Sequence, residues 1–274
     1  MSRPVEWAAF LYLCFLLICY NTIHLLLKNK NMRLKHPAVK NLLFLLFLSS
    51  TPMFIYAQSN QNAATIFKKY IAAMGGEKGF RSIKDMVITG SSEIQGMALT
   101  ITETKKAPDK WMQLIEMTRG EQKATVQRQV YNGTTGYQEL QEKKVPVTGD
   151  DLEEFKESAD IAMDLHPEKY GIKRTLKGME DVNGSKAYVI DVVAAKNKKS
   201  EEYYDATTYL LVKKIQGNGK KLQTTEYSDY RDVPGAEGYK MPYKVTESEP
   251  GSPSITEIVT NVEINKGIDD SVFN

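Results

Sequence analysis

The sequence predicts a mainly β domain of the α+β type, in which helices cover the apolar face of an antiparallel sheet. Residues 203–247 contain three strand-like runs, separated by turns at Gly217-Asn218-Gly219 and Val233-Pro234-Gly235. The last run alternates: one side carries Tyr239, Met241, Tyr243 and Val245, and the other carries Lys240, Pro242, Lys244 and Thr246. A period of two is typical of a sheet with one buried and one solvated face. The rest of the chain must therefore supply a cover for the apolar side.

The first 57 residues are expected to lie outside this domain. Residues 8–27 form an apolar run that reaches the length of about 20 residues needed to cross a bilayer. A second export-like segment begins at Met32, with a basic stretch, an apolar stretch over Leu42–Ile55 and a cleavage site before Gln58. We interpret residues 32–57 as a signal peptide and residues 1–31 as an apolar extension of the gene model. The alternative is that residues 8–27 anchor the protein in the inner membrane.

Charge and cysteine content exclude several classes of function for the predicted domain, residues 58–274. The first 57 residues hold six Lys/Arg and one acid, so the remaining 30 basic and 33 acidic residues have a net charge of −3. A nucleic-acid partner is therefore not expected. Both cysteines, Cys14 and Cys19, lie before residue 58, which leaves the domain without disulfides or thiolate metal ligands. Large residues, Leu13 and Ile18, precede them, so we expect no lipid-modified cysteine and a soluble monomer in the periplasm.

The domain begins with a predicted amphipathic helix over Gln61–Met74. Its apolar residues fall on one face, namely Ile66, Phe67, Tyr70, Ile71 and Met74. Gly75-Gly76 is expected to end the helix, because glycine readily takes a positive φ at a helix C-terminus. No strand is predicted before this glycine pair and no helix is predicted to open on it, so we do not interpret it as a phosphate loop.

Strands are predicted from Asp85 onward. Met97, Leu99 and Ile101 alternate with smaller polar or weakly apolar residues, and Trp111–Met117 follows, with Trp111, Gln113 and Ile115 on one side. Ala124–Tyr131 and Tyr137–Leu140 form a predicted hairpin across Asn132-Gly133. Short strands separated by turn residues indicate a barrel or sandwich rather than βαβ units.

One helix interrupts the strands. Asp150 is its expected N-cap, with Glu153 as the capping-box partner, and the helix is expected to stop near His166-Pro167. Its apolar residues share one face, namely Leu152, Phe155, Ala159 and Met163. Such a helix is suited to cover the apolar side of the sheet.

Two further strands are predicted toward the C-terminus. Ala187–Val193 follows the turn signal Asn183-Gly184, and the last strand covers Thr256–Asn265. In this last strand we expect Ile258, Val262 and Ile264 to share one face.

The order of these elements resembles that of the outer-membrane lipoprotein-sorting proteins of the LolA/LolB fold over most of residues 60–274. Local matches are Tyr131-Asn132-Gly133, Asn183-Gly184, Asp205-Ala206-Thr207-Thr208, Met241-Pro242-Tyr243 and the closing Asn261, Asp270 and Phe273. The resemblance implies an incomplete antiparallel β-barrel, or strongly curved sheet, whose apolar hollow is closed by helices and takes up acyl chains. Two features depart from it. The LolA carrier has an arginine near the proline of its early strands, where this chain has Lys110 beside Pro108, and the LolB receptor is itself a lipoprotein.

The resemblance also implies which residues line the hollow. The candidates are Met97, Leu99, Ile101, Trp111, Ile115, Phe155, Met163, Leu211, Ile258 and Val262. In this interpretation Phe155 and Met163 belong to a mobile lid, and Trp111 faces the hollow. The alternative that the sequence leaves open is that these residues fill an ordinary core.

No catalytic residue, metal site or cofactor is predicted. His166 is the only histidine after residue 57, so a catalytic triad or a histidine metal cluster lacks a second candidate. Adjacent acids such as Glu201 and Glu202 face opposite ways on a strand. We therefore expect an exported, non-enzymatic carrier of lipid acyl chains, those of lipoproteins in particular. The alternatives are a non-catalytic accessory module that binds envelope proteins and, third, a hydrolase whose carboxylates are distant in the sequence.

Overall fold

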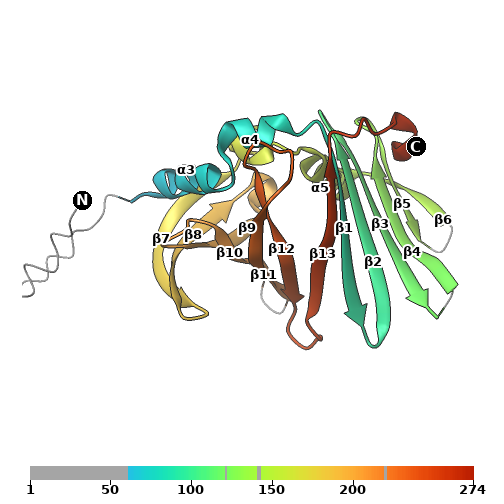
Figure 1. Ribbon diagram of the computed structural model, residues 1–274. Coiled ribbons are helices and arrows are strands. Elements are labelled where there is room, and N and C mark those ends of the chain that lie inside the picture. Colours follow the sequence, from blue (N-terminus) through green and yellow to red (C-terminus); the bar gives the residue numbers. More distant parts are fainter. Residues whose placement is uncertain (1–60, 121, 141–142, 219–220) are drawn as a thin grey trace, which may run out of the picture. The chain divides into compact units, whose positions relative to one another are not determined.

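The computed structural model describes residues 61–274, except 121, 141–142 and 219–220 (Figure 1). The described residues form one compact unit. The predicted signal peptide at residues 32–57 and the segment 1–31, with its possible anchor at 8–27, lie outside the described residues. Within the described residues, none of the helices combines the length and the apolar character that crossing a membrane requires.

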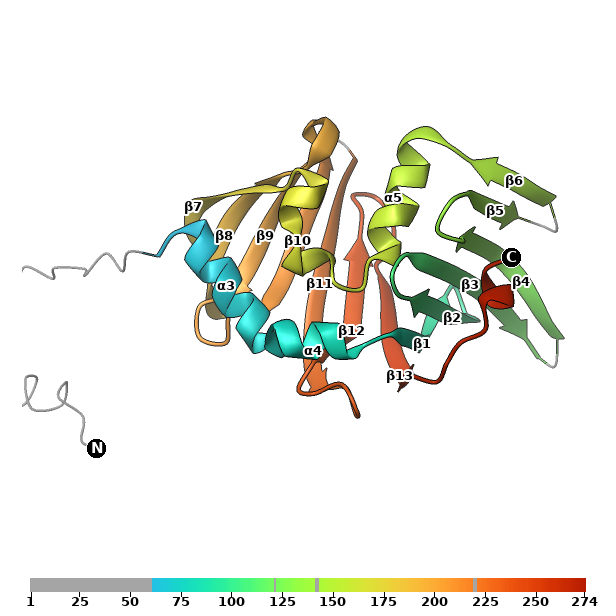
Figure 2. The ribbon, with the colours of Figure 1, turned by 90° about the horizontal axis from the view of Figure 1, so that it is seen from above.

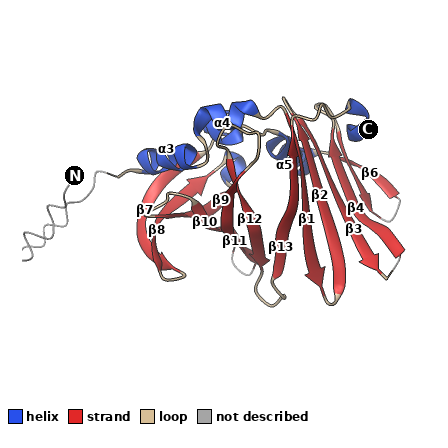
Figure 3. Cartoon of the chain, in the orientation of Figure 1, coloured by secondary structure: helices blue, strands red, loops and turns tan. Residues whose placement is uncertain are grey.

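A single sheet of 13 strands dominates the unit, which confirms the mainly β prediction (Figure 3). The strands are β1 (Asp85–Ile94), β2 (Met97–Lys106), β3 (Lys110–Arg119), β4 (Gln122–Tyr131), β5 (Gly136–Leu140), β6 (Lys143–Val147), β7 (Lys173–Val182), β8 (Ser185–Val193), β9 (Lys199–Asp205), β10 (Leu211–Asn218), β11 (Lys221–Asp232), β12 (Lys240–Ser248) and β13 (Ile255–Ile264). In the described part of the chain three α-helices accompany them: α3 (Ala63–Ala73), α4 (Gly76–Ser82) and α5 (Gly149–Ala159). Short 3₁₀ turns are η1 (Met163–Leu165), η2 (Pro167–Tyr170), η3 (Ala195–Asn197) and η4 (Asp270–Phe273).

The sheet is antiparallel throughout and does not close on itself. The strand order is β6-β5-β4-β3-β2-β1-β13-β12-β11-β10-β9-β8-β7, so that β6 and β7 are the two edges of the described sheet. Viewed from above, the sheet curves from β7 through β12 and β13 to β6 (Figure 2). The chain passes from one edge to the other through α5, η1 and η2. We call the face that carries these helices the inner face and the opposite one the outer face.

The helices α3 and α4 cover the inner face of one arm of the sheet. Ile66 and Tyr70 of α3 are buried against Ile190 of β8 and Tyr204 of β9, which lie on the inner face. The ring centroids of Tyr70 and Tyr204 are 5.2 Å apart in an edge-to-face arrangement. Asn62 caps α3 by accepting a hydrogen bond from the Thr65 amide. The amphipathic pattern read from the sequence therefore places this helix correctly.

The helix α5 covers the other arm at the ends of β3 and β4. Phe155 and Ala159 are buried there against Trp111 and Tyr131. Between the two arms, Met86 and Ile88 of β1 pack with Met241 of β12 in a third cluster. The inner face is thus filled by core side chains wherever a helix or a chain crossing covers it.

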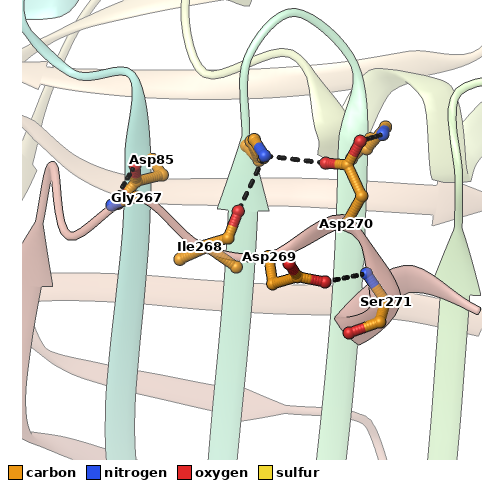
Figure 4. A network of polar contacts seen from close by, with 8 residues as sticks. Asp85, Gly267, Ile268, Asp269, Asp270 and Ser271 are labelled. Carbon is orange, nitrogen blue, oxygen red and sulfur yellow. Dashed lines mark hydrogen bonds and ion pairs between the residues drawn. The ribbon is translucent and has the colours of Figure 1, made fainter.

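The C-terminal segment packs on the outer face instead. Asp85 accepts hydrogen bonds from the amides of Lys266 and Gly267 at 2.7 and 3.0 Å, which fixes the segment as it leaves β13. Figure 4 shows the bond from Gly267. Asp270 then forms ion pairs with Lys106 and Lys110 at 2.7 and 2.6 Å. Phe273, 1% exposed, ends the segment by packing against Met112 and Val130. The C-terminal segment thereby covers part of the outer face, and its only regular element is the short 3₁₀ turn η4.

Three local predictions about the helices are wrong. Gly76 opens α4, although no helix was expected there; Gly75, with φ 109°, lies where a β-carbon would meet Gly238 O at 2.5 Å. The N-cap of α5 is Thr148, without a side-chain capping bond, rather than Asp150. The helix ends at Ala159 rather than near His166, because the Asp160 carboxylate accepts hydrogen bonds from the Ala162 amide and from Lys169 and Tyr170.

Candidate functional site

An apolar surface that no described helix covers remains on the inner face beside α5. Its residues are Met97, Leu99 and Ile101 of β2 and Ile115 and Met117 of β3, and we call them the open apolar face. The register pairs Leu99 with Met117 and Ile101 with Ile115, so the side chains lie in two adjacent rows. All five are partly exposed, and none packs against the buried clusters formed by the described residues.

The same surface extends beyond β2 and β3. Leu140 of β5 and Val145 of β6 are 43% and 46% exposed and share the inner face with Gln127 and Gln138, their register partners. On the other side Ile255 of β13 is 37% exposed and pairs with Glu247. Several large apolar side chains therefore remain accessible on one face of the curved sheet, which is typical of a binding surface rather than of a filled core.

Four of the predicted ligand-binding residues belong to this surface: Met97, Leu99, Ile101 and Ile115. Trp111 is on the inner face beneath α5, and Phe155 is on the side of α5 that packs against it; they are 5% and 6% exposed. Their ring centroids are 4.9 Å apart, and the Trp111 indole donates a hydrogen bond to Glu103 at 2.8 Å.

The other four predicted residues lie elsewhere. Leu211 packs at the edge of the cluster beneath α3, and Val262 packs against the cluster around Met86 and Ile88. Met163 is part of η1 and not of α5, because Asp160 ends the helix before it. Ile258 lies on the outer face, 41% exposed, opposite Lys244.

The placement of Ile258 corrects the expectation that it shares a face with Val262. A bulge interrupts the pairing of β1 with β13 between Thr89 and Gly90, so the strand changes phase between Val259 and Val262. Val259 and Val262 are consequently both on the inner face, whereas Ile258 is not. Periodicity alone does not reveal a bulge, because one extra residue inverts every later position.

Polar groups also occupy the inner face next to the open apolar face. Glu103, two residues from Ile101, accepts the Trp111 hydrogen bond and lies 3.2 Å from Lys105. Glu257 of β13 is partly buried, and burial raises its pKa to about 7, with the negative charges of Glu103 and Glu247 adding to the shift. No pattern in the sequence had indicated Glu257, since it is one of several acids in a strand with mixed composition.

A second buried polar group holds the other arm together. Arg174 of β7, whose side chain is 10% exposed, stacks on Phe67 at 3.6 Å and lies 3.5 Å from Glu202 and 4.0 Å from Asp164. Glu202 accepts a hydrogen bond from Tyr204, and Asp164 accepts one from Tyr70 at 3.1 Å. Burial raises the pKa of Asp164, and the nearby Arg174 opposes that shift. The network thus joins α3, η1 and the strands β7 and β9.

The Arg174 network is relevant to the arginine that the LolA carrier has near the proline of its early strands, where this chain has Lys110 beside Pro108. Lys110, which stands beside Pro108 in the chain, pairs with Asp270 on the outer face and does not reach the helices. The arginine that contacts them is Arg174, from the opposite edge of the sheet.

The described residues contain no group of three or more His, Cys, Asp or Glu arranged to hold a metal ion. His166 lies between η1 and η2, with a side chain 40% exposed and its Nδ1 3.9 Å from Glu168. A hollow of about 340 Å³ lies on the outer face between β8 and β12, lined partly by Asp205, Glu226 and Lys244. It shares no residue with the open apolar face.

Comparison with known proteins was informative only at the level of structure. No family model and no curated protein matches the sequence. Among solved structures, a DUF1329 family protein from Desulfovibrio piger is similar with a TM-score of 0.53 and 13% identity, over 77% of this chain and 97% of that one.

Two other solved structures are similar to the same extent. A putative outer membrane lipoprotein-sorting protein domain from Vibrio parahaemolyticus has a TM-score of 0.52 and 15% identity, over 77% of this chain and 96% of that one. A LolA superfamily protein from Nitrosomonas europaea has a TM-score of 0.51 and 11% identity, over 78% and 98%. The chain therefore has a LolA-like fold, which confirms the resemblance and the predicted fold class.

Proposed function

We propose that this chain with a LolA-like fold is an exported, non-enzymatic carrier that binds the acyl chains of lipids, those of lipoproteins in particular. The observation that carries the proposal is the open apolar face, a set of accessible apolar side chains on the one face of the sheet that helices cover elsewhere. The processed chain, residues 58–274, would act as a monomer in the periplasm after removal of the signal peptide at residues 32–57. No cofactor takes part in this function.

Binding would be driven by the burial of the acyl chain. Each methylene group transferred from water to an apolar surface gains about 0.8 kcal/mol. A chain that buries roughly ten methylenes would gain about 8 kcal/mol before the cost of association, which is sufficient for a reversible carrier. The segment that holds α5, η1 and η2 crosses the inner face beside the open apolar face, so its displacement would admit a chain and its return would cover it.

The test begins with the processed protein isolated from its own cells and analysed by native mass spectrometry. A lipid adduct supports the carrier. A stable protein partner without lipid supports instead the accessory module. Purified residues 58–274 are then titrated with a long-chain fatty acid, and binding is followed by calorimetry.

A pair of variants on β2 locates the binding surface. Leu99→Asn places an amide on the open apolar face, and Ala98→Asn places the same group at an exposed position on the outer face of the same strand. We expect Leu99→Asn to weaken fatty-acid binding at least tenfold and Ala98→Asn to leave it within twofold of the parent. Equal effects of the two variants, or the absence of saturable binding, would exclude the open apolar face as an acyl-chain site.

A further inference from the structure

The inner face holds a carboxyl group whose position depends on a neighbouring glycine. Glu257 of β13 lies over Gly90 of β1, where a β-carbon would be only 2.1 Å from Glu257 Oε1. Gly90 does not have a positive φ, so the backbone does not require a glycine there. The missing side chain instead leaves the space that the carboxyl group occupies.

A second polar group on the same face also lacks a partner. Ser92 is 8% exposed, and its Oγ has no hydrogen-bond partner among the described residues. It lies on the inner face opposite Leu99. Because Ser91 pairs with Ile258, the register places Ser92 beside Glu257. Buried hydroxyl groups without a partner are uncommon, and a ligand is one explanation for them.

The charged groups around Glu257 are mostly acids. Glu103 faces it from β2 and Glu247 faces it from β12, while Lys105 of β2 is held by Glu103 at 3.2 Å. Glu247 accepts a hydrogen bond from Gln223 at 3.3 Å. Among the described residues, Glu257 itself receives neither a hydrogen bond nor an ion pair. An anionic ligand group would therefore be repelled here, whereas a cationic donor would find an unused acceptor.

Apolar residues lie on both sides of Glu257 and Ser92. Gly90, which Glu257 overlies, pairs with Ile101 of the open apolar face, and Val245 of β12 pairs with Glu257 itself. An alkyl chain lying on the open apolar face would thus bring one of its ends to Glu257.

We propose that Glu257, with Ser92 beside it, binds the polar end of the lipid whose acyl chain occupies the open apolar face, and that this polar end carries a protonated primary amine. The inference rests on the proposed function, because it assigns the head group of a ligand whose chain occupies the open apolar face. An ammonium group offers three donors, which matches a carboxylate and a hydroxyl that both lack partners.

The test compares three ligands with the same chain and different ends: decylammonium, decanol and decanoate. Each is titrated at pH 8 into residues 58–274, below the concentration at which it aggregates. We expect decylammonium to bind at least tenfold more tightly than decanol, and decanoate to bind more weakly than decanol. At pH 5.5 the preference for the amine should shrink, because Glu257 is then protonated.

Three variants assign the preference to Glu257. Glu257→Gln should reduce the ratio of amine to alcohol affinity to less than threefold and leave decanol binding within twofold. Gly90→Ala should act in the same direction by displacing the carboxyl group, whose flexible end is free to move. Glu263→Gln, on the exposed outer face of the same strand, is the matched control and should preserve the ratio.

The outcomes separate this inference from the function on which it rests. Decanol binding without a preference for the amine, or an undiminished preference in Glu257→Gln, overturns the inference and leaves the carrier intact. Saturable binding of none of the three ligands overturns both.

Discussion

Trp111 and Phe155 meet edge to face, with their ring centroids 4.9 Å apart and their planes inclined at 62°. The pair joins β3 to α5, and it is the main apolar contact that keeps this helix on the inner face together with Tyr131 and Ala159. The stability of α5 on the sheet therefore depends on these four residues, and the lid movement proposed above would have to break their contacts.

Removal of the Phe155 ring tests how α5 is held. We expect Phe155→Ala to lower the free energy of unfolding by about 3–5 kcal/mol, since it empties a buried aromatic site. Trp111 is the only tryptophan after residue 57, so its emission should also shift to longer wavelength as water reaches the indole. Chemical denaturation followed by fluorescence measures both effects. A matched control is Leu152→Ala, a half-buried position of the same helix, for which the loss should be smaller.

The same variant distinguishes a lid from a fixed core. A lid that opens on loading would lose fatty-acid affinity in Phe155→Ala. A large loss of stability with unchanged affinity would show that α5 only completes the core.

Loss of Arg174 should be strongly destabilising. Arg174→Ala leaves Glu202 and Asp164 close together, buried and without their cation, and breaking a buried ion pair from one side costs about 3–5 kcal/mol. The loss should be largest at pH 8 and smaller near pH 5, because burial raises the pKa of Asp164 and its protonation removes one of the two unpaired charges. Urea denaturation at the two pH values measures it, with Lys173→Ala, an exposed neighbour on β7, as the control. A loss independent of pH would mean that the stacking on Phe67, not the charge, is what matters.

Glu257 should make stability depend on pH near neutrality. Its pKa in the folded protein is raised to about 7, mainly by burial, whereas an ordinary glutamate titrates near 4.3 in the unfolded chain. Between about pH 4.3 and 7 the folded state therefore binds the extra proton, so stability falls as pH rises through this window and levels off above it. Relative to the parent, Glu257→Gln should gain stability across the window. Denaturation midpoints from pH 4 to 8 check this, and a constant difference between the two proteins would contradict it.

Asp270 should make stability fall as the pH decreases, which is opposite to the effect of Glu257 and occurs at lower pH. Hydrogen bonds from Lys106, and then from Lys110, lower its pKa to about 2, while an unfolded aspartate titrates near 3.9. Its contribution is fully present above about pH 3.9 and disappears as pH falls through about 2. Asp270→Asn should consequently be less stable than the parent at pH 6, with the difference vanishing near pH 2. Asp181→Asn, which removes an exposed carboxylate bonded to Lys186, is the control and should show a smaller difference at pH 6.

Much of the fold was accessible from the sequence because its signals are local. The alternation of Met241, Tyr243 and Val245 correctly gave β12 one apolar face, and the amphipathic pattern of residues 61–74 predicted α3. The strands β6, β7 and β9 were missed, since the runs Lys143–Val147, Lys173–Val182 and Lys199–Asp205 are rich in charge and carry little apolar periodicity. The edge strands β6 and β7 have a composition that is common at sheet edges, because charged side chains discourage other chains from pairing with the free backbone groups.

Only part of the candidate site could be predicted, because the sequence again revealed only what local signals determine. Met97, Leu99 and Ile101 could be grouped because one uninterrupted strand sets their common face. Ile258 was misplaced by the bulge, and Met163 by the early end of α5, both of which depend on contacts distant in the chain or on one side chain's hydrogen bonds. The closeness of Glu257 to Gly90 was out of reach for the same reason, because it arises only when β13 pairs with β1.

The number of strands in the sheet determines how its two edges, β6 and β7, are oriented relative to each other. In a ring built only of antiparallel neighbours, strand directions must alternate all the way round, which requires an even number of strands. This sheet has 13 strands, all paired antiparallel, so β6 and β7 run in the same direction. The antiparallel hydrogen-bond pattern of the sheet therefore cannot continue from β6 to β7, and these two edges would have to pair in parallel to close it. If the chain is the carrier proposed above, the opening between β6 and β7 would let a long chain enter the inner face sideways instead of end first.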